Sequence, residues 1–131
     1  MAGAGKILLV EDEPNIGNAM RLMLKRVGFE VENVSSGREA LAWLDRMSGN
    51  GKANLALMMS DYHLSDITGL DVFQHAKTLG FSAPQLLISG DEQDDAVKEW
   101  RRQPRRSFLG KPFAINDLLK AVKRAIEEND E

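Results

Sequence analysis

The sequence predicts an α/β fold, in which a doubly wound, five-stranded parallel sheet carries five helices on its two faces. Five short strand-like segments, four of them apolar runs, alternate with five stretches of helical periodicity along the 131 residues. This alternation favours right-handed crossovers, which return each helix over the sheet. Polar residues also follow each of the four apolar runs. Because the carboxyl ends of parallel strands meet at one edge, we expect these residues to form a site there.

The composition is that of one ordinary globular domain. With 43% hydrophobic and 28% charged residues, the chain is typical neither of disordered nor of fibrous proteins. Its length predicts one domain over residues 1–131, with a core at about 6–127. Cysteine is absent, which excludes disulfides and Cys-based metal sites. The net charge of −3 argues against direct binding to nucleic acid or membranes. No secretion signal or membrane-length apolar run is visible, so we expect a cytoplasmic location.

The first strand is expected at Ile7–Val10, and a helix follows it. Pro14 suits a first helical turn, and Gly28 ends the helix. Apolar residues recur with helical spacing between these two points. The predicted apolar face consists of Ile16, Met20, Met23, Leu24 and Val27.

The second unit begins with a half-exposed edge strand. Apolar and polar residues alternate over Phe29–Val34, as they do in strands with one buried face. Ser36 and Glu39 have the spacing of a capping box. They predict the start of a helix that carries Leu41, Leu44 and Met47. The small and polar residues 48–52 predict a flexible loop.

The remaining elements alternate in the same way. We expect strands at Leu55–Ser60, Gln85–Ile88 and Ser107–Leu109, and helices at about Leu70–Leu79, closed by Gly80, and about Glu92–Gln103. The last helix is amphipathic. Its apolar residues are Ile115, Leu118, Leu119, Val122 and Ile126.

Three carboxylates follow the first and third strands. Glu11 and Asp12 come directly after Val10, and Asp61 comes directly after Ser60. Brought together in a crevice, these groups repel one another unless a cation lies among them. Oxygen-only ligands favour Mg²⁺ or Mn²⁺ over zinc. Mg²⁺ is the better candidate, and since it prefers to share its shell with phosphate oxygens, the predicted second ligand is a phosphoryl group.

A serine and a lysine complete this predicted site. Ser89 follows the fourth strand and Lys111 follows the fifth, so a hydroxyl and an ammonium group are available to bind phosphoryl oxygens. A carboxylate beside a divalent cation can attack phosphorus without further activation. We therefore predict Asp61 as the phosphoryl acceptor, Asp12 as a direct metal ligand and Glu11 as an outer or water-mediated ligand.

Several motifs occur in the order and spacing of a known family. They are Leu8-Leu-Val-Glu-Asp-Glu-Pro14, Asp61-Tyr-His-Leu-Ser-Asp-Ile-Thr-Gly69, Ser89, Phe108, and Lys111 before Pro112. On these motifs the chain resembles the receiver domain of two-component response regulators, from residue 6 to residue 127. The resemblance implies a CheY-like, flavodoxin-like sheet with strand order 2-1-3-4-5.

The resemblance also implies a reaction. A phosphohistidine of a sensor kinase or histidine phosphotransfer protein would pass its phosphoryl group to Asp61. Mg²⁺ would be held by Asp12, Asp61 and the backbone carbonyl of His63. By the same resemblance, His63 and Asp91 are expected to influence the lifetime of the phosphoryl group.

The resemblance further implies a conformational switch. Ser89 would move toward the phosphoryl group while the Phe108 side chain turns inward. The population of conformers would then shift in the surface formed by the fourth helix, fifth strand and fifth helix, and this surface would bind a downstream protein. The protein is expected to be a monomer or a phosphorylation-dependent dimer. The Lys111-Pro112 bond is usually cis in this family.

Two positions in the loop after Asp61 depart from the family pattern. Ser65 replaces a common proline, and Thr68 replaces a common aspartate before Gly69. Before the fifth strand, Gln103-Pro104 replaces the usual Gly-Ala.

An arginine-rich segment surrounds that last departure. Arg101 and Arg102 suit the negative end of a helix that Pro104 stops, and Arg105 and Arg106 are then solvated. The sharper hypothesis is that the four arginines dock an acidic partner. Trp43 and Trp100 are expected to be packing residues rather than docking residues.

Other functions compete with the receiver interpretation. The chain is expected to be a stand-alone receiver whose output comes from a separate protein, or a receiver excised from a longer regulator or hybrid kinase. From another class, a small Mg²⁺-dependent phosphohydrolase would also use Asp61 as nucleophile, but it needs an acid/base carboxylate at the position of His63. A flavodoxin-like electron carrier shares the strand pattern, but acidic residues 11–13 would repel a cofactor phosphate.

Overall fold

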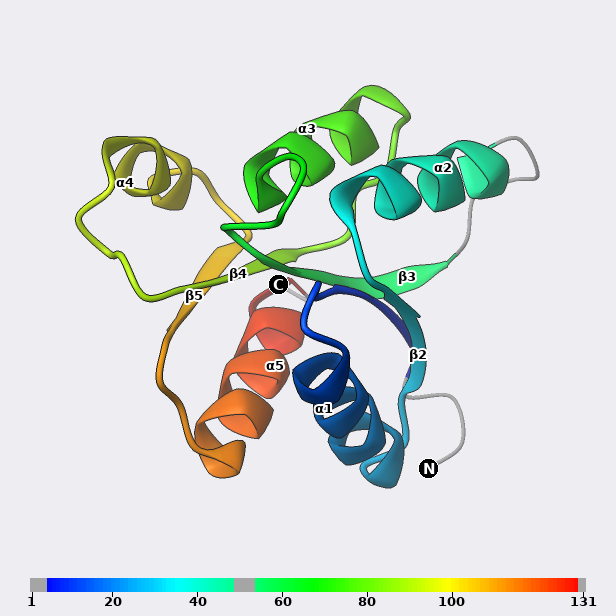
Figure 1. Ribbon diagram of the computed structural model, residues 1–131, viewed down its shortest axis with the longest axis vertical. Coiled ribbons are helices and arrows are strands. Elements are labelled where there is room, and N and C mark those ends of the chain that lie inside the picture. Colours follow the sequence, from blue (N-terminus) through cyan, green and yellow to red (C-terminus); the bar gives the residue numbers. More distant parts are fainter. Residues whose placement is uncertain (1–4, 49–53, 130–131) are drawn as a thin grey trace.

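A computed structural model describes residues 5–48 and 54–129 of the chain. The strands are β1 Lys6–Val10, β2 Glu30–Val34, β3 Leu55–Asp61, β4 Gln85–Ser89 and β5 Arg106–Gly110. The helices are α1 Pro14–Arg26, α2 Gly37–Ser48, α3 Gly69–Thr78, α4 Asp95–Arg101 and α5 Ile115–Asn129. All strand pairs are parallel, and the order is β2-β1-β3-β4-β5, which confirms the predicted fold (Figure 1).

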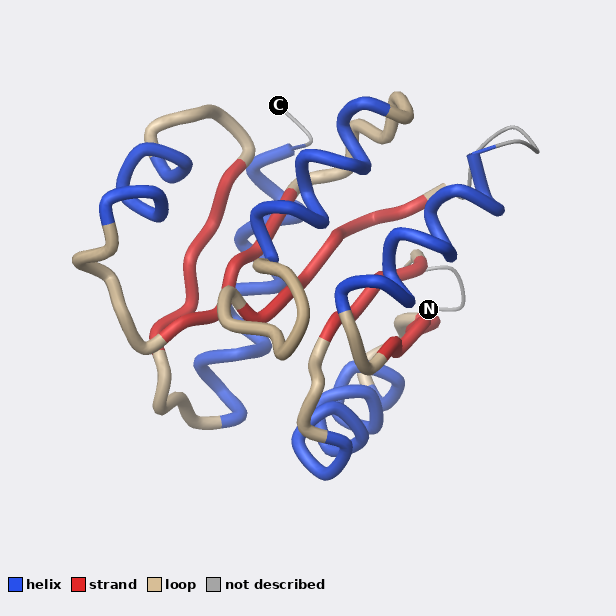
Figure 2. Tube along the Cα trace, turned by 45° about the horizontal axis from the view of Figure 1, so that its top comes forward, coloured by secondary structure: helices blue, strands red, loops and turns tan. Residues whose placement is uncertain are grey.

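Helices cover both faces of this sheet. In Figures 1 and 2, α1 and α5 lie on one side of the strands, and α2, α3 and α4 lie on the other. Neighbouring residues of a strand point to opposite faces, so Leu8 packs into the cluster under α2, α3 and α4 while Leu9 packs into the cluster under α1 and α5. Both residues are buried because the sheet is covered twice, and this explains why β1 is a continuous apolar run.

The apolar face of α1 is narrower than its sequence predicts. Met20 and Leu24 are buried, but Ile16 is 40% exposed and Val27 is 50% exposed, so the prediction is wrong for these two positions. Gly17, rather than Ile16, is the buried residue of the first turn, because a Cβ there would meet the side chain of Asn33 on β2. Close approach of the helix to the sheet thus turns Ile16 outward.

The first turn of α5 also exposes a residue that helical spacing assigns to the apolar face. Ile115 is half-exposed, although its spacing includes it in the apolar face. Leu118 is the first buried residue of this helix, and Val122 is buried one turn later. The apolar face therefore begins to cover the sheet only after the first turn.

The start of α2 departs from a simple capping box. The Ser36 hydroxyl accepts from the Glu39 backbone N–H at 3.0 Å, as predicted, but the Glu39 carboxylate accepts from the amide of Ser35 rather than Ser36. The next two amides, of residues 37 and 38, donate to Asp66 at 3.0 and 2.9 Å. A residue from the loop after β3 therefore completes this cap. Beyond Ser48, the loop predicted at 48–52 lies outside the described residues.

The fourth helix is shorter than predicted. It spans Asp95–Arg101 instead of about Glu92–Gln103, because Asp94 has an extended backbone and caps the helix through its side chain. Trp43 and Trp100 are both buried, so their expected role in packing is confirmed.

Candidate functional site

The predicted site residues lie together at the carboxyl edge of the sheet. Glu11 and Asp12 follow β1 directly, Asp61 ends β3 and Lys111 follows β5 directly. Parallel register aligns these ends, since Asp61 pairs with Ile88, the residue before Ser89. The strand topology therefore gathers residues that are up to 100 positions apart in the sequence.

Three carboxylates form a compact acidic cluster. One oxygen from each of Glu11, Asp12 and Asp61 lies within 4.8 Å of the others. Glu11 is 2% exposed and Asp61 is 6% exposed. Burial, followed by the negative charge of Asp61, raises the pKa of Glu11 to about 7. The cluster thus holds more negative charge than its surroundings stabilise.

One lysine partly compensates this charge. The Lys111 ammonium lies 2.7 Å from Asp61 Oδ1. Burial acts to lower the pKa of Lys111, but the hydrogen bond and charge of Asp61, with the charges of Glu11 and Asp12, raise the pKa above its ordinary value. A single ammonium beside three carboxylates leaves negative charge for a divalent cation. The all-oxygen donor set fits Mg²⁺ or Mn²⁺.

The buried Ser89 closes the β4 side of the site. Its hydroxyl oxygen accepts from the Asp91 backbone N–H at 3.0 Å, and its carbonyl accepts from the Lys111 backbone N–H at 2.9 Å. The hydroxyl hydrogen remains available to donate to a ligand oxygen. The Lys111-Pro112 bond is cis, as the resemblance implies.

Thr68, one of the two residues of this loop that depart from the family pattern, holds the end of the loop after Asp61. The Thr68 side chain accepts from the Asp71 backbone N–H at 3.2 Å, and the Asp71 carboxylate accepts from the Thr68 backbone N–H at 3.0 Å. Thr68 thus supplies a capping box for α3 in place of aspartate. The backbone of His63 pairs with Thr68 in an antiparallel bridge, and the His63 side chain is exposed.

Tyr62 is a site neighbour that the sequence analysis missed. It follows Asp61 directly, is buried, and its hydroxyl donates to Asp94 Oδ1 at 3.3 Å. The same oxygen accepts from the amides of Ala96 and Val97 at the start of α4. Burial, followed by the charge of Asp94, raises the pKa of Tyr62 above its ordinary value. This hydrogen bond joins the end of β3 to the cap of α4.

The arginine-rich segment, residues 101–106, runs from the end of α4 to the start of β5. Each of its arginines has a local partner: Arg101 with Glu92 at 3.3 Å, Arg102 with Glu99 at 3.4 Å, Arg105 with the Ser82 carbonyl, and Arg106 with the Pro104 carbonyl and the Gln103 side chain at 3.0 Å each. The Arg101 guanidinium also lies 4.6 Å from the ring centroid of the half-buried Phe108. The structure therefore places Phe108 beside this segment and not among the carboxylates.

Comparisons with known proteins agree with this geometry. A family sequence model described as the response regulator receiver domain matches residues 7–123. The chain is 28% identical to a C4-dicarboxylate transport transcriptional regulatory protein of Rhizobium meliloti, over 98% of the chain but only 26% of that protein. The chain thus spans about a quarter of this curated relative.

Solved structures are similar over nearly their whole length. The receiver domain of the hybrid histidine kinase CckA has 29% identity and a TM-score of 0.75, with 93% of this chain and 99% of that one covered. The chemotaxis protein CheY4 of Vibrio cholerae has 26% identity and a TM-score of 0.77, with 92% and 98% covered. None of the helices in residues 5–48 and 54–129 has the length and apolar character needed to cross a bilayer.

Proposed function

The chain belongs to the family of response regulator receiver domains, and from this premise we propose that Asp61 accepts a phosphoryl group in a Mg²⁺-dependent reaction. Receiver domains are typically phosphorylated, bind Mg²⁺ and act between histidine kinases and downstream effectors. The donor proposed here is a phosphohistidine of a sensor kinase or of a histidine phosphotransfer protein.

The observation that carries the proposal is the pairing of Asp61 with Lys111 inside the acidic cluster. An Asp61 carboxylate oxygen attacks phosphorus, the phosphorus–nitrogen bond to histidine breaks, and an acyl phosphate forms. Lys111 shifts from the carboxylate to a phosphoryl oxygen, and the Ser89 hydroxyl donates to another. Asp12, Asp61 and the His63 carbonyl would hold the cation directly and Glu11 would hold it through water, and the bound cation would supply positive charge to the transferring group.

The proposed output is a change in the surface of α4, β5 and α5. When Ser89 moves toward the phosphoryl group, the Phe108 ring turns inward and leaves Arg101. Arg101, Arg102, Arg105 and Arg106 then present a basic surface to an acidic effector. Reversing the charge at Arg105 and Arg106 should weaken effector binding and leave phosphorylation of Asp61 unchanged. Unchanged affinity for the effector would count against an acidic partner.

Mass spectrometry of the intact protein tests the central step. Incubation with acetyl phosphate and Mg²⁺ should add one phosphate to the wild-type protein and none to Asp61→Asn. Asp66→Asn is the matched control, because Asp66 lies in the same loop but caps α2 instead of joining the acidic cluster. A wild-type protein without a mass gain, or an equal gain in Asp61→Asn, would contradict the proposal.

Two further expectations stay predictions. The cytoplasmic location rests on the sequence alone. The chain is either a stand-alone receiver or part of a longer regulator. Its relative in Rhizobium meliloti is such a longer regulator, and the chain covers 26% of that protein.

A further inference from the structure

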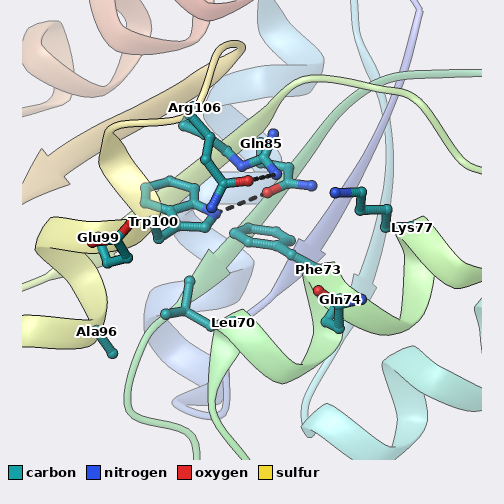
Figure 3. A pocket seen from close by; sticks show the side chains of 10 residues that line it. Leu70, Phe73, Gln74, Lys77, Gln85, Ala96, Glu99, Trp100 and Arg106 are labelled. Atoms are coloured by element: carbon teal, nitrogen blue, oxygen red, sulfur yellow. Dashed lines mark hydrogen bonds between the residues drawn. The ribbon is translucent and has the colours of Figure 1, made fainter.

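A cavity of about 300 Å³ opens between α3 and α4, away from the phosphorylation site (Figure 3). Gln85, which begins β4, lies at its base, whereas Ser89, which ends the same strand, belongs to the acidic edge. The base of the cavity and the site of Asp61 therefore lie toward opposite ends of β4. This volume is at the lower end of the range for small-molecule sites.

Aromatic rings form the wall of this cavity. Phe73 of α3 and Trp100 of α4 are stacked, with ring centroids 5.9 Å apart and an interplanar angle of 17°. The Trp100 indole N–H donates to Gln85 Oε1 at 2.9 Å, and Gln85 is only 5% exposed. Packing and a buried hydrogen bond thus fix the wall, and a ligand would not need to order it.

Two cations with no acidic partner border the same space. Arg106 uses both terminal nitrogens on neutral oxygens, of Pro104 and Gln103, while its Nε is buried without an acceptor among the described residues. Lys77 points from α3 toward Gln85 in Figure 3. Within residues 5–48 and 54–129, neither Lys77 nor Arg106 forms an ion pair.

The acidic residue that lines the cavity is already engaged. Glu99, the acidic residue of the cavity wall, pairs with Arg102 at 3.4 Å. Burial, followed by the charge of Arg105, lowers the pKa of the Arg106 guanidinium below its ordinary value. Arg105 lines a second cavity, which shares Lys77 and Arg106 with the first. A chain with a net charge of −3 thus concentrates uncompensated positive charge here.

We propose that this cavity binds a small organic carboxylate with a planar apolar body. The apolar body lies against Phe73 and Trp100, and the carboxylate pairs with the Lys77 ammonium beside the positive charge of the Arg106 guanidinium. Two cations without an acidic partner favour a ligand that supplies negative charge. An inorganic anion would satisfy the charge but would leave the aromatic wall uncovered, so the site should prefer the organic acid.

Benzoate is a suitable probe, and the chain has an internal pair of reporters. The Trp100 indole N–H lies in the cavity wall, while Trp43 lies on α2 outside it. In ¹H–¹⁵N spectra of the whole protein, benzoate should shift the Trp100 indole signal in a saturable manner and leave the Trp43 signal in place. Benzamide, its neutral analogue, and inorganic phosphate should each bind about tenfold or more weakly.

Variants separate this site from a general salt effect. Arg106→Gln and Lys77→Gln should each weaken benzoate binding about tenfold, whereas Arg102→Gln should not, because Arg102 is paired outside the cavity. Well-dispersed spectra of each variant verify that it is folded. The proposal is overturned if benzoate leaves the Trp100 signal unchanged, if benzamide or phosphate binds as tightly, or if both cavity variants retain wild-type affinity.

Discussion

At the residue scale, the buried carboxyl of Glu11 makes stability depend on pH. Its pKa is about 7 in the folded protein against an ordinary value of 4.5, mainly because of burial. The folded state therefore holds this proton more tightly than the unfolded chain does. As the pH rises from 4.5 to 7, the free energy of unfolding should fall by about 2 kcal/mol in the absence of a divalent cation.

Thermal unfolding at about pH 5 and about pH 8 in a metal chelator measures this effect. The wild-type melting temperature should drop between the two conditions, and the drop should be smaller in Glu11→Gln, which cannot ionise. Glu13→Gln is the control, since its exposed side chain is outside the cluster. An equal drop in the wild type and Glu11→Gln would show that the buried carboxyl does not titrate in this range.

At the scale of elements, α4 depends on one carboxylate. Asp94 Oδ1 accepts from two amides of the first turn and from the Tyr62 hydroxyl. Asp94→Ala should lower the free energy of unfolding by about 1 kcal/mol. Tyr62→Phe should cost less because the cap remains. Hydrogen exchange of the Ala96 and Val97 amides should accelerate in Asp94→Ala but not in Asp95→Ala, and equal exchange in the two variants would contradict the role of this cap.

A glycine at the start of α3 is required where this helix approaches the end of β3. Gly69 donates its N–H to the Tyr62 carbonyl at 2.9 Å, and a Cβ at this position would overlap the backbone oxygen of Asp61. Gly69→Ala should therefore destabilise the protein by about 2 kcal/mol or more and displace Asp61. Denaturant unfolding and the rate of phosphate gain from acetyl phosphate measure the two effects. Gly90→Ala, where a Cβ meets only ordinary contacts, should change stability little, and a comparable loss in both variants would refute the steric argument.

At the scale of the whole molecule, the sequence predicts the order of elements and the edge on which the site forms. Periodicity and short-range signals such as Pro14 carry that information. Contacts between distant segments do not follow from the sequence pattern. Asp66 completes the cap of α2, and Tyr62 reaches Asp94, but neither residue belongs to a repeating pattern. Ile16 was misplaced for a related reason, since helical spacing alone does not include the close approach of Gly17 to β2.

The last prediction concerns communication from Asp61 to the surface of α4, β5 and α5. Ser89 ends β4. Its hydroxyl accepts from the Asp91 backbone N–H in the segment that leads to α4, and its carbonyl accepts from the Lys111 backbone N–H in the segment between β5 and α5. If movement of the Ser89 hydroxyl carries the switch, Ser89→Ala should still gain phosphate by mass, even if more slowly, while the phosphorylation-dependent shifts in ¹H–¹⁵N spectra of α4 and β5 decrease strongly. Ser107→Ala, on β5 but away from the acidic edge, should keep them. Full wild-type shifts in phosphorylated Ser89→Ala would assign the coupling to another path, of which the hydrogen bond from Tyr62 to Asp94 is the first to test.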